Sequence, residues 1–76
     1  MPLFHFNSQT DGKILQDVEG EELPDVAAAR EVAIASAREA LVEAVKMKDT
    51  PPDCIQVTDS QGRELMTVLT ADLLRN

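Results

Sequence analysis

The sequence predicts a two-layer α+β domain, in which one long helix packs on one face of an antiparallel four-stranded sheet in the order ββαββ. One strongly helical segment, short alternating segments on both sides of it, and two turn sequences support this fold. The predicted helix is Asp25–Met47, the strands are Leu3–Asn7, Lys13–Asp17, Cys54–Thr58 and Glu64–Leu69, and a short helical turn follows at Ala71–Leu74 with Arg75 near its end. The 76 residues form one domain with a small core, which favours self-association.

The first two strands are expected to form a hairpin. Phe4 and Phe6 alternate with polar residues, so they share one face of the strand. Asp11-Gly12 is a strong signal for a tight turn, and Ile14 is the expected inward residue of the returning strand. Because an isolated hairpin is unstable in water, this one needs the helix to cover it.

The helix has recognisable ends. Either Asp25 caps it, or Pro24 occupies its first turn, and both interpretations start it at the same place. Pro51 and Pro52 prevent its continuation, so it ends near Met47–Asp49. At 100° per residue one apolar stripe faces the sheet, flanked by Ile34 and Val45; it consists of Val26, Ala29, Ala33, Ala37, Ala40, Leu41 and Ala44.

A second, weaker apolar line runs along the back of the helix and includes Ala28, Val32, Ala35 and Val42. It is either helix-favouring filler or part of a contact with another chain, and the sequence leaves both open. A helix of this length spans about 33 Å, whereas strands of this length span about 17–20 Å. One end of the helix therefore overhangs the sheet, or the helix crosses it diagonally.

The second hairpin turns at Asp59–Gly62, with Ile55 and Val57 facing the helix. The opposite sheet face would then carry a mixed set of side chains, namely Leu3, His5, Leu15, Cys54, Gln56 and Met66. An uncovered face of this kind can mark a partner site. The candidate interface residues are therefore Leu3, His5, Leu15, Gln56 and Met66 on the sheet, with Val32 and Val42 on the helix.

Composition excludes several classes of function. The net charge is -7 and no basic stripe is present, which argues against binding nucleic acid or an anionic membrane. The single cysteine, Cys54, permits no intramolecular disulfide and fits a reducing compartment. The N-terminus has no signal-peptide pattern, and the apolar runs are too short to span a bilayer. We therefore expect a cytoplasmic protein.

No motif for catalysis or metal binding is complete. The acidic segment from Asp11 to Glu22 has the length of a calcium loop, but Lys13, Leu15 and Gln16 stand where oxygen ligands and a glycine are needed. His5 is expected to be a half-exposed sheet residue, and Cys54 a small apolar residue at a strand start. We therefore predict no enzyme activity, metal, cofactor or small-molecule ligand.

Arg30 lies one turn into the helix, close in sequence to an acidic segment. We predict that its stem packs on the sheet edge and that its guanidinium pairs with Asp17 and Glu19. This would be a structural ion pair.

An ordered set of short motifs covers nearly the whole chain. It comprises Met-Pro-x-Phe-x-Phe at the start, then Asp11-Gly12, Asp17, Glu19-Gly20, Glu22-Leu23-Pro24-Asp25, Ala28-Ala29-Arg30, Ala37-Arg38-Glu39, Val57-x-Asp59, Gly62, Leu65–Val68 and Asp72. Together they resemble a family of very small bacterial proteins that carries only a domain-of-unknown-function label. The resemblance implies a small soluble cytoplasmic domain and no assigned activity.

The functional prediction is a small non-enzymatic interaction module that forms a homodimer or binds another protein. The mixed sheet face, the second apolar line of the helix and the small core support it. The alternative is an acidic regulatory protein that binds a basic partner surface through residues 11–25, which carry six acids against Lys13 alone.

Overall fold

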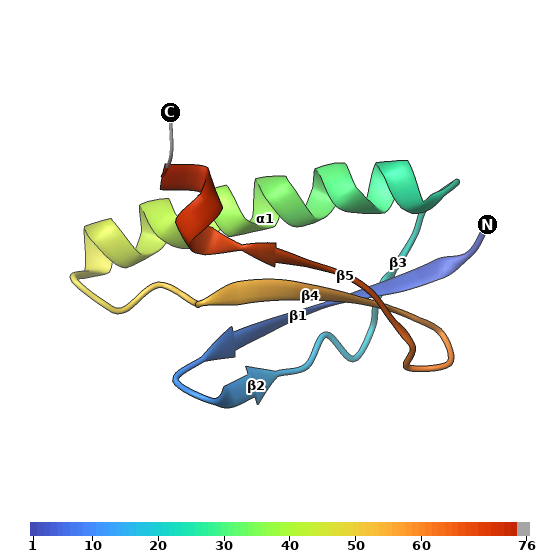
Figure 1. Cartoon of the computed structure of the whole chain (residues 1–76), viewed down its shortest axis with the longest axis horizontal. Helices are drawn as coiled ribbons and strands as arrows, with labels where there is room; N and C mark the ends of the chain where they lie inside the picture. The colour runs from blue at the N-terminus through green and yellow to red at the C-terminus, as the bar shows by residue number, and fades with distance from the viewer. Residues whose placement is uncertain (75–76) are drawn as a thin grey trace.

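The computed structural model describes residues 1–74 and confirms an α+β fold (Figure 1). One long helix lies on a five-stranded antiparallel sheet with strand order β2-β1-β4-β5, and β3 also pairs with β1. The elements are β1 (Leu3–Thr10), β2 (Lys13–Leu15), β3 (Glu21–Glu22), α1 (Val26–Met47), β4 (Cys54–Asp59), β5 (Glu64–Leu69) and the 3-10 helix η1 (Thr70–Leu74). Arg75, placed by the sequence near the end of the terminal turn, lies outside the described residues.

The predicted order ββαββ is wrong, because a third strand precedes the helix. Glu21 and Glu22 of β3 pair with Phe4 and Leu3 of β1. Two acidic residues carry no apolar alternation, so the sequence indicated only a polar connection there. The free edge of β1 supplies the hydrogen-bonding partner that makes this segment a strand.

The two predicted turns are confirmed. Asp11 and Gly12 both have positive φ, 49° and 79°, as a two-residue hairpin turn of type I′ requires. This tight turn lets β1 continue to Thr10, three residues beyond the predicted end. In the second hairpin Gly62 has φ 80°, and its N–H donates to the Asp59 carbonyl at 3.0 Å.

Both ends of the helix follow local chemistry. The Asp25 side chain caps α1 by accepting a hydrogen bond from the Ala28 N–H at 2.8 Å. Lys48 ends the helix in the left-handed conformation, φ 54°. The buried stripe of alanines is also confirmed, since Ala29, Ala33 and Ala37 have no exposed surface. Val26, although on that stripe, is 49% exposed at the helix end.

The core lies between these alanines and one face of the sheet. Its buried members are Phe4, Ala29, Ala33, Ala37, Ile55 and Val57, with Phe6, Leu23, Met66, Val68 and Leu73 packed against them. Side chains of directly opposite residues in an antiparallel pair lie on the same face. Phe6 is opposite Val57, and Val57 is opposite Met66, so this row points toward α1.

The register corrects three predicted positions. Met66 lies on the helix side and packs against the core, whereas the sequence placed it on the opposite face. Leu15 is opposite Ser8 on the helix side, and Ile14 is opposite Gln9 on the open face, the reverse of the prediction. A one-residue change of register moves a side chain to the other face, and the short β2 has too few residues to fix its register by pattern.

The helix covers only part of the sheet. α1 packs mainly on β4 and β5, and η1 lies on the same side at the end of β5 (Figure 1). β2 is at the far margin, where Leu15 remains 75% exposed. Within residues 1–74, no helix combines the length and hydropathy needed to cross a membrane.

Candidate functional site

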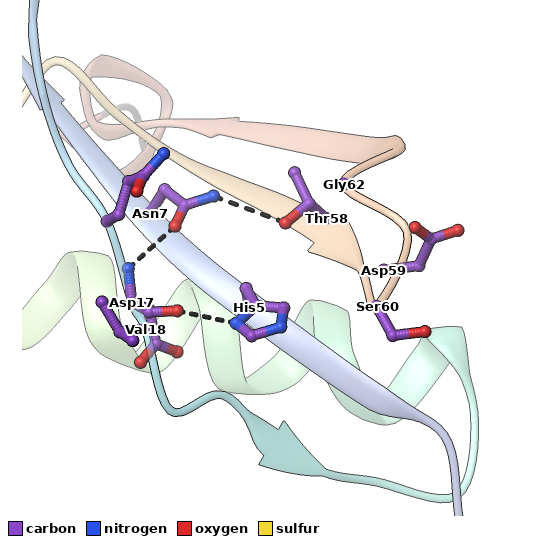
Figure 2. A pocket seen from close by; sticks show the side chains of 9 residues that line it. His5, Asn7, Asp17, Val18, Thr58, Asp59, Ser60 and Gly62 are labelled. Atoms are coloured by element: carbon purple, nitrogen blue, oxygen red, sulfur yellow. Dashed lines mark hydrogen bonds between the residues drawn. The ribbon is translucent and has the colours of Figure 1, made fainter.

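A polar pocket of about 310 Å³ lies on the open face of the sheet, opposite α1 (Figure 2). Three segments form it: the middle of β1, the loop after β2, and the end of β4 with its turn. The lining residues are His5, Asn7, Gln16, Asp17, Val18, Thr58, Asp59, Ser60 and Gly62.

Asp17 holds the interruption between β2 and β3. Both short strands pair with the same edge of β1, and residues 16–20 lie opposite only residues 5–7. In this gap the Asp17 carboxylate accepts hydrogen bonds from the N–H groups of Phe6 at 3.1 Å and Gly20 at 3.2 Å. The side chain thus replaces the carbonyl partners that a regular strand would offer β1.

Asn7 and His5 hold the backbone of the same residue. The Asn7 Oδ1 accepts from the Asp17 N–H at 2.9 Å, and its amide nitrogen donates to the Thr58 hydroxyl at 3.4 Å. His5 Nδ1 lies 2.6 Å from the Asp17 carbonyl oxygen. Because a carbonyl only accepts, His5 Nδ1 carries the proton of this hydrogen bond.

Gly20 closes the loop against the imidazole. Its φ is +74°, and a Cβ there would lie 2.9 Å from the Phe4 carbonyl oxygen and 3.0 Å from the His5 ring. Both the backbone conformation and the available space therefore require glycine at this position.

On the other side of the pocket, Asp59 organises the β4–β5 turn. One carboxylate oxygen accepts from the N–H groups of Gln61 and Arg63, each at 2.9 Å, and the Arg63 Nε is 3.4 Å from the other. The hydrogen bond from the Arg63 N–H is the largest cause that holds the pKa of Asp59 below its usual 3.8. Desolvation, the next in size, opposes it, and the Gln61 N–H and the Arg63 guanidinium lower the pKa further. Figure 2 shows the Asp59 and Ser60 side chains directed away from His5.

Most polar groups of this pocket therefore hold the fold. Cys54 does not line this pocket. Cys54 is opposite Gln9, four residues along β1 from His5 and hence about 13 Å away. It starts β4, is buried, and its thiol donates to Gln9 Oε1 at 3.7 Å. Burial, followed by the charges of Asp53 and Glu64, raises the pKa of the Cys54 thiol.

The predicted ion pair of Arg30 with Asp17 and Glu19 is wrong. The Asp17 carboxylate accepts backbone hydrogen bonds beside β1, whereas Arg30 lines a groove beside β5. Among residues 1–74, the one salt bridge is that of Arg63 with Asp59. Closeness in sequence was misleading because the stem of Arg30 leaves the helix on the flank that faces β5, and β1 lies on the other side of β4.

A second candidate surface is the outer edge of β5. Within residues 1–74 no strand pairs with this edge. Residues 65–69 are uncharged, and Leu65 and Leu69 are 37% and 48% exposed. Beside the edge, on the helix side, lies a groove of about 280 Å³ formed by Arg30, Ile34, Met66, Thr67, Val68, Leu69, Asp72 and Leu73.

The predicted interface residues are spread over different surfaces. Leu3, His5 and Gln56 lie on the open face of the sheet, as expected from their alternation with buried residues. Val42 is 52% exposed on the back of α1, while Val32 is half-buried. With Met66 in the core and Leu15 at the β2 margin, these residues form no single patch, and their role in binding stays a prediction.

Comparison with known proteins identifies a family. The family model of a domain of unknown function, DUF6894, matches residues 3–71. The chain belongs to the DUF6894 family. The predicted resemblance to a family with only a domain-of-unknown-function label is thereby confirmed. No curated protein and no solved structure matches the chain.

The structure gives a role to several of the motifs on which the resemblance to a family rests. Asp17 and Gly20 hold the loop between β2 and β3, while Asp59 and Gly62 form the second turn. Asn7 was not predicted as a site residue, although an asparagine inside a strand is unfavourable and signals a specific hydrogen-bonding role.

Proposed function

We propose that this chain is a small non-enzymatic interaction domain that associates with a second copy of itself. The free edge of β5 carries the proposal. An exposed strand edge presents unpaired N–H and C=O groups that bind another extended segment, and natural proteins commonly block such edges with charge, proline or a bulge. Here residues 65–69 contain neither charge nor proline, and an apolar groove follows the edge. The β4–β5 ladder has one register irregularity, beside Val57 and Thr58, which leaves Leu65 as the extra residue at the start of this segment.

The other edge of the sheet is protected. β2 has three residues, and the loop of residues 16–20 interrupts the strand before β3. A regular ladder cannot continue across that interruption. The difference between the two edges favours β5 as the binding edge.

The buried, unpaired Cys54 supports a reducing environment, and we propose the cytoplasm as the location.

The acidic segment offers less support for a regulatory protein that binds a basic surface. Asp17 and Asp25 are engaged in backbone hydrogen bonds, and Glu21 and Glu22, adjacent in β3, point to opposite faces of the sheet. The remaining acids therefore do not form one continuous face.

Sedimentation velocity of the full chain tests the proposal over about 10 to 500 µM. We expect the sedimentation coefficient to rise with concentration to that of a dimer. A monomer throughout this range would overturn self-association. Two variants address the other surfaces: Val42→Lys on the back of the helix, and the triple variant Glu19→Gln, Glu21→Gln and Glu22→Gln in the acidic segment. Both are expected to dimerise like the wild type, and loss of the dimer in either would relocate the interface.

A further inference from the structure

The exposed edge strand β5 is nearly palindromic. Residues 65–69 read Leu-Met-Thr-Val-Leu, so residues at equal distances from Thr67 are both apolar. Two copies of such a strand, paired antiparallel about a two-fold axis, would place each apolar residue opposite another. Isologous interfaces require this kind of self-complementarity.

The hydrogen bonds with β4 determine which groups of β5 face outward. The Thr70 N–H donates to the Asp53 carbonyl at 3.0 Å, and Cys54 is opposite Leu69. Because hydrogen-bonded and non-hydrogen-bonded pairs alternate in an antiparallel ladder, the backbone groups of Leu69 and Thr67 point away from β4. The centre of the near-palindrome therefore carries free donors and acceptors.

We propose, as a refinement that rests on the self-association above, that β5 pairs antiparallel with β5 of a second copy about a two-fold axis at Thr67. The two sheets then form one continuous sheet. On the helix side, Met66 of each copy lies opposite Val68 of the other. Leu69 is on the open face, where it lies opposite Leu65 of the other copy. The two Thr67 residues at the axis exchange two backbone hydrogen bonds, and the irregularity of the β4–β5 ladder at Leu65 interrupts the outer pairs.

Registers centred elsewhere are less complementary. An axis at Met66 would place the charged Glu64 opposite Val68. An axis at Val68 would place Met66 opposite Thr70 and leave Leu65 outside the paired strands. The axis at Thr67 keeps the apolar residues of both strands opposite one another and places no charged residue opposite an apolar one. The Glu64 carboxylate accepts a hydrogen bond from the Thr67 hydroxyl, so the Glu64 side chains of both copies lie near the axis.

The groove beside β5 fits the same arrangement. Ile34, Met66, Val68 and Leu73 give it an apolar floor. Its margins carry Arg30 from α1 and Asp72 from η1, so its formal charge balances although the whole chain has a net charge of -7. Two acidic copies can therefore approach here with less repulsion than at the acidic β3 side.

Amide hydrogen exchange of the wild-type chain tests the register without mutation. In the monomer the N–H groups of Thr67 and Leu69 face solvent, whereas in the dimer they are hydrogen-bonded. We expect their exchange to slow by about tenfold or more between dilute and concentrated samples. The N–H of Ile14, which faces outward on the β2 edge, serves as the internal control and should not change. Protection of Ile14 instead of Thr67 would overturn the proposal.

A matched pair of substitutions tests the edge. Leu69→Lys on β5 and Leu15→Lys on β2 add the same charge to exposed leucines at opposite edges. We expect Leu69→Lys to weaken dimerisation by about tenfold or more, because the substitution enters a two-fold interface twice. Leu15→Lys should leave it unchanged. If the wild type dimerises and Leu69→Lys dimerises equally well, the β5 interface is refuted, while self-association stands.

Cross-linking tests the position of the axis. With Cys54→Ser as background, Thr67→Cys places two thiols on the axis, where the Cα atoms of a hydrogen-bonded pair are about 5.5 Å apart, within disulfide range. We expect mild oxidation to yield a covalent dimer from Thr67→Cys and little from Leu15→Cys in the same background. Equal yields from both would overturn the proposed register.

Discussion

Replacing Asp17 by alanine should destabilise the fold strongly, although the residue lies in a surface loop. The substitution removes the carboxylate that accepts the N–H groups of Phe6 and Gly20 at 3.1 and 3.2 Å. A hydrogen bond to a charged group contributes about 1.5–3 kcal/mol, and partial burial at this site favours the lower end. The expected loss is therefore about 2–3 kcal/mol, since water can replace part of each bond.

That loss is large for a chain of this size. At about 0.05–0.15 kcal/mol per residue, the whole domain has a free energy of unfolding of about 4–11 kcal/mol. One kcal/mol shifts the Tm of a small domain by about 4–8 °C, so the variant should melt about 10–20 °C below the wild type. Urea unfolding followed by circular dichroism, with thermal melts in parallel, would measure both quantities.

Glu19→Ala is the matched control, because it removes one negative charge from the same loop and its side chain is exposed. Its free energy of unfolding should stay within about 0.5 kcal/mol of the wild type. Asn7→Ala removes the acceptor of the Asp17 N–H, so its effect should be less than additive with that of Asp17→Ala. If Asp17→Ala were as stable as Glu19→Ala, the loop would not depend on its carboxylate and the reasoning would be refuted.

Two further predictions concern Gly20 and Asp59, on the two sides of the pocket on the open face. Gly20→Ala should lower the free energy of unfolding by about 2 kcal/mol or more, because the new Cβ would meet the Phe4 carbonyl oxygen and the His5 ring. Gly12 has a similar φ but lies in open space, so Gly12→Ala should lower it by only about 1 kcal/mol. Equal losses in urea unfolding would contradict the steric argument. The Asp59 pKa lies below 3.8 in the folded state, so its contribution to stability is present above that pH and is lost as the pH falls through the folded pKa. The difference in unfolding free energy between the wild type and Asp59→Ala should therefore shrink from about pH 7 to about pH 2, and a constant difference would exclude the turn carboxylate as its source.

Much of the fold could be predicted because it depends on signals within a few residues. Asp11-Gly12 identified the first turn, Asp25 the start of the helix, and the spacing of Ala29, Ala33 and Ala37 its buried face. Each of these rests on a backbone conformation, a capping hydrogen bond or a helical period that neighbouring residues determine.

The misplaced residues depend on partners distant in the sequence. Met66 could be assigned to a face only once it was known to lie opposite Val57. Arg30 was predicted to pair with Asp17 because they are near in the sequence, but Arg30 leaves α1 beside β5, whereas Asp17 lies beside β1, on the other side of β4. The candidate site in β5 was missed for the same reason, since a strand edge is free only when the strand order of the sheet is known.

By itself, then, the sequence determined most local elements of this protein: its helix, its turns, four of its five strands and its family pattern. The tertiary structure decided which edge of the sheet is free and which face Met66 occupies. It also decided that the Asp17 carboxylate accepts backbone hydrogen bonds at a strand interruption and forms no ion pair with Arg30. The physical reason is that periodicity and capping act over a few residues, whereas strand order and register are set by pairing between segments tens of residues apart.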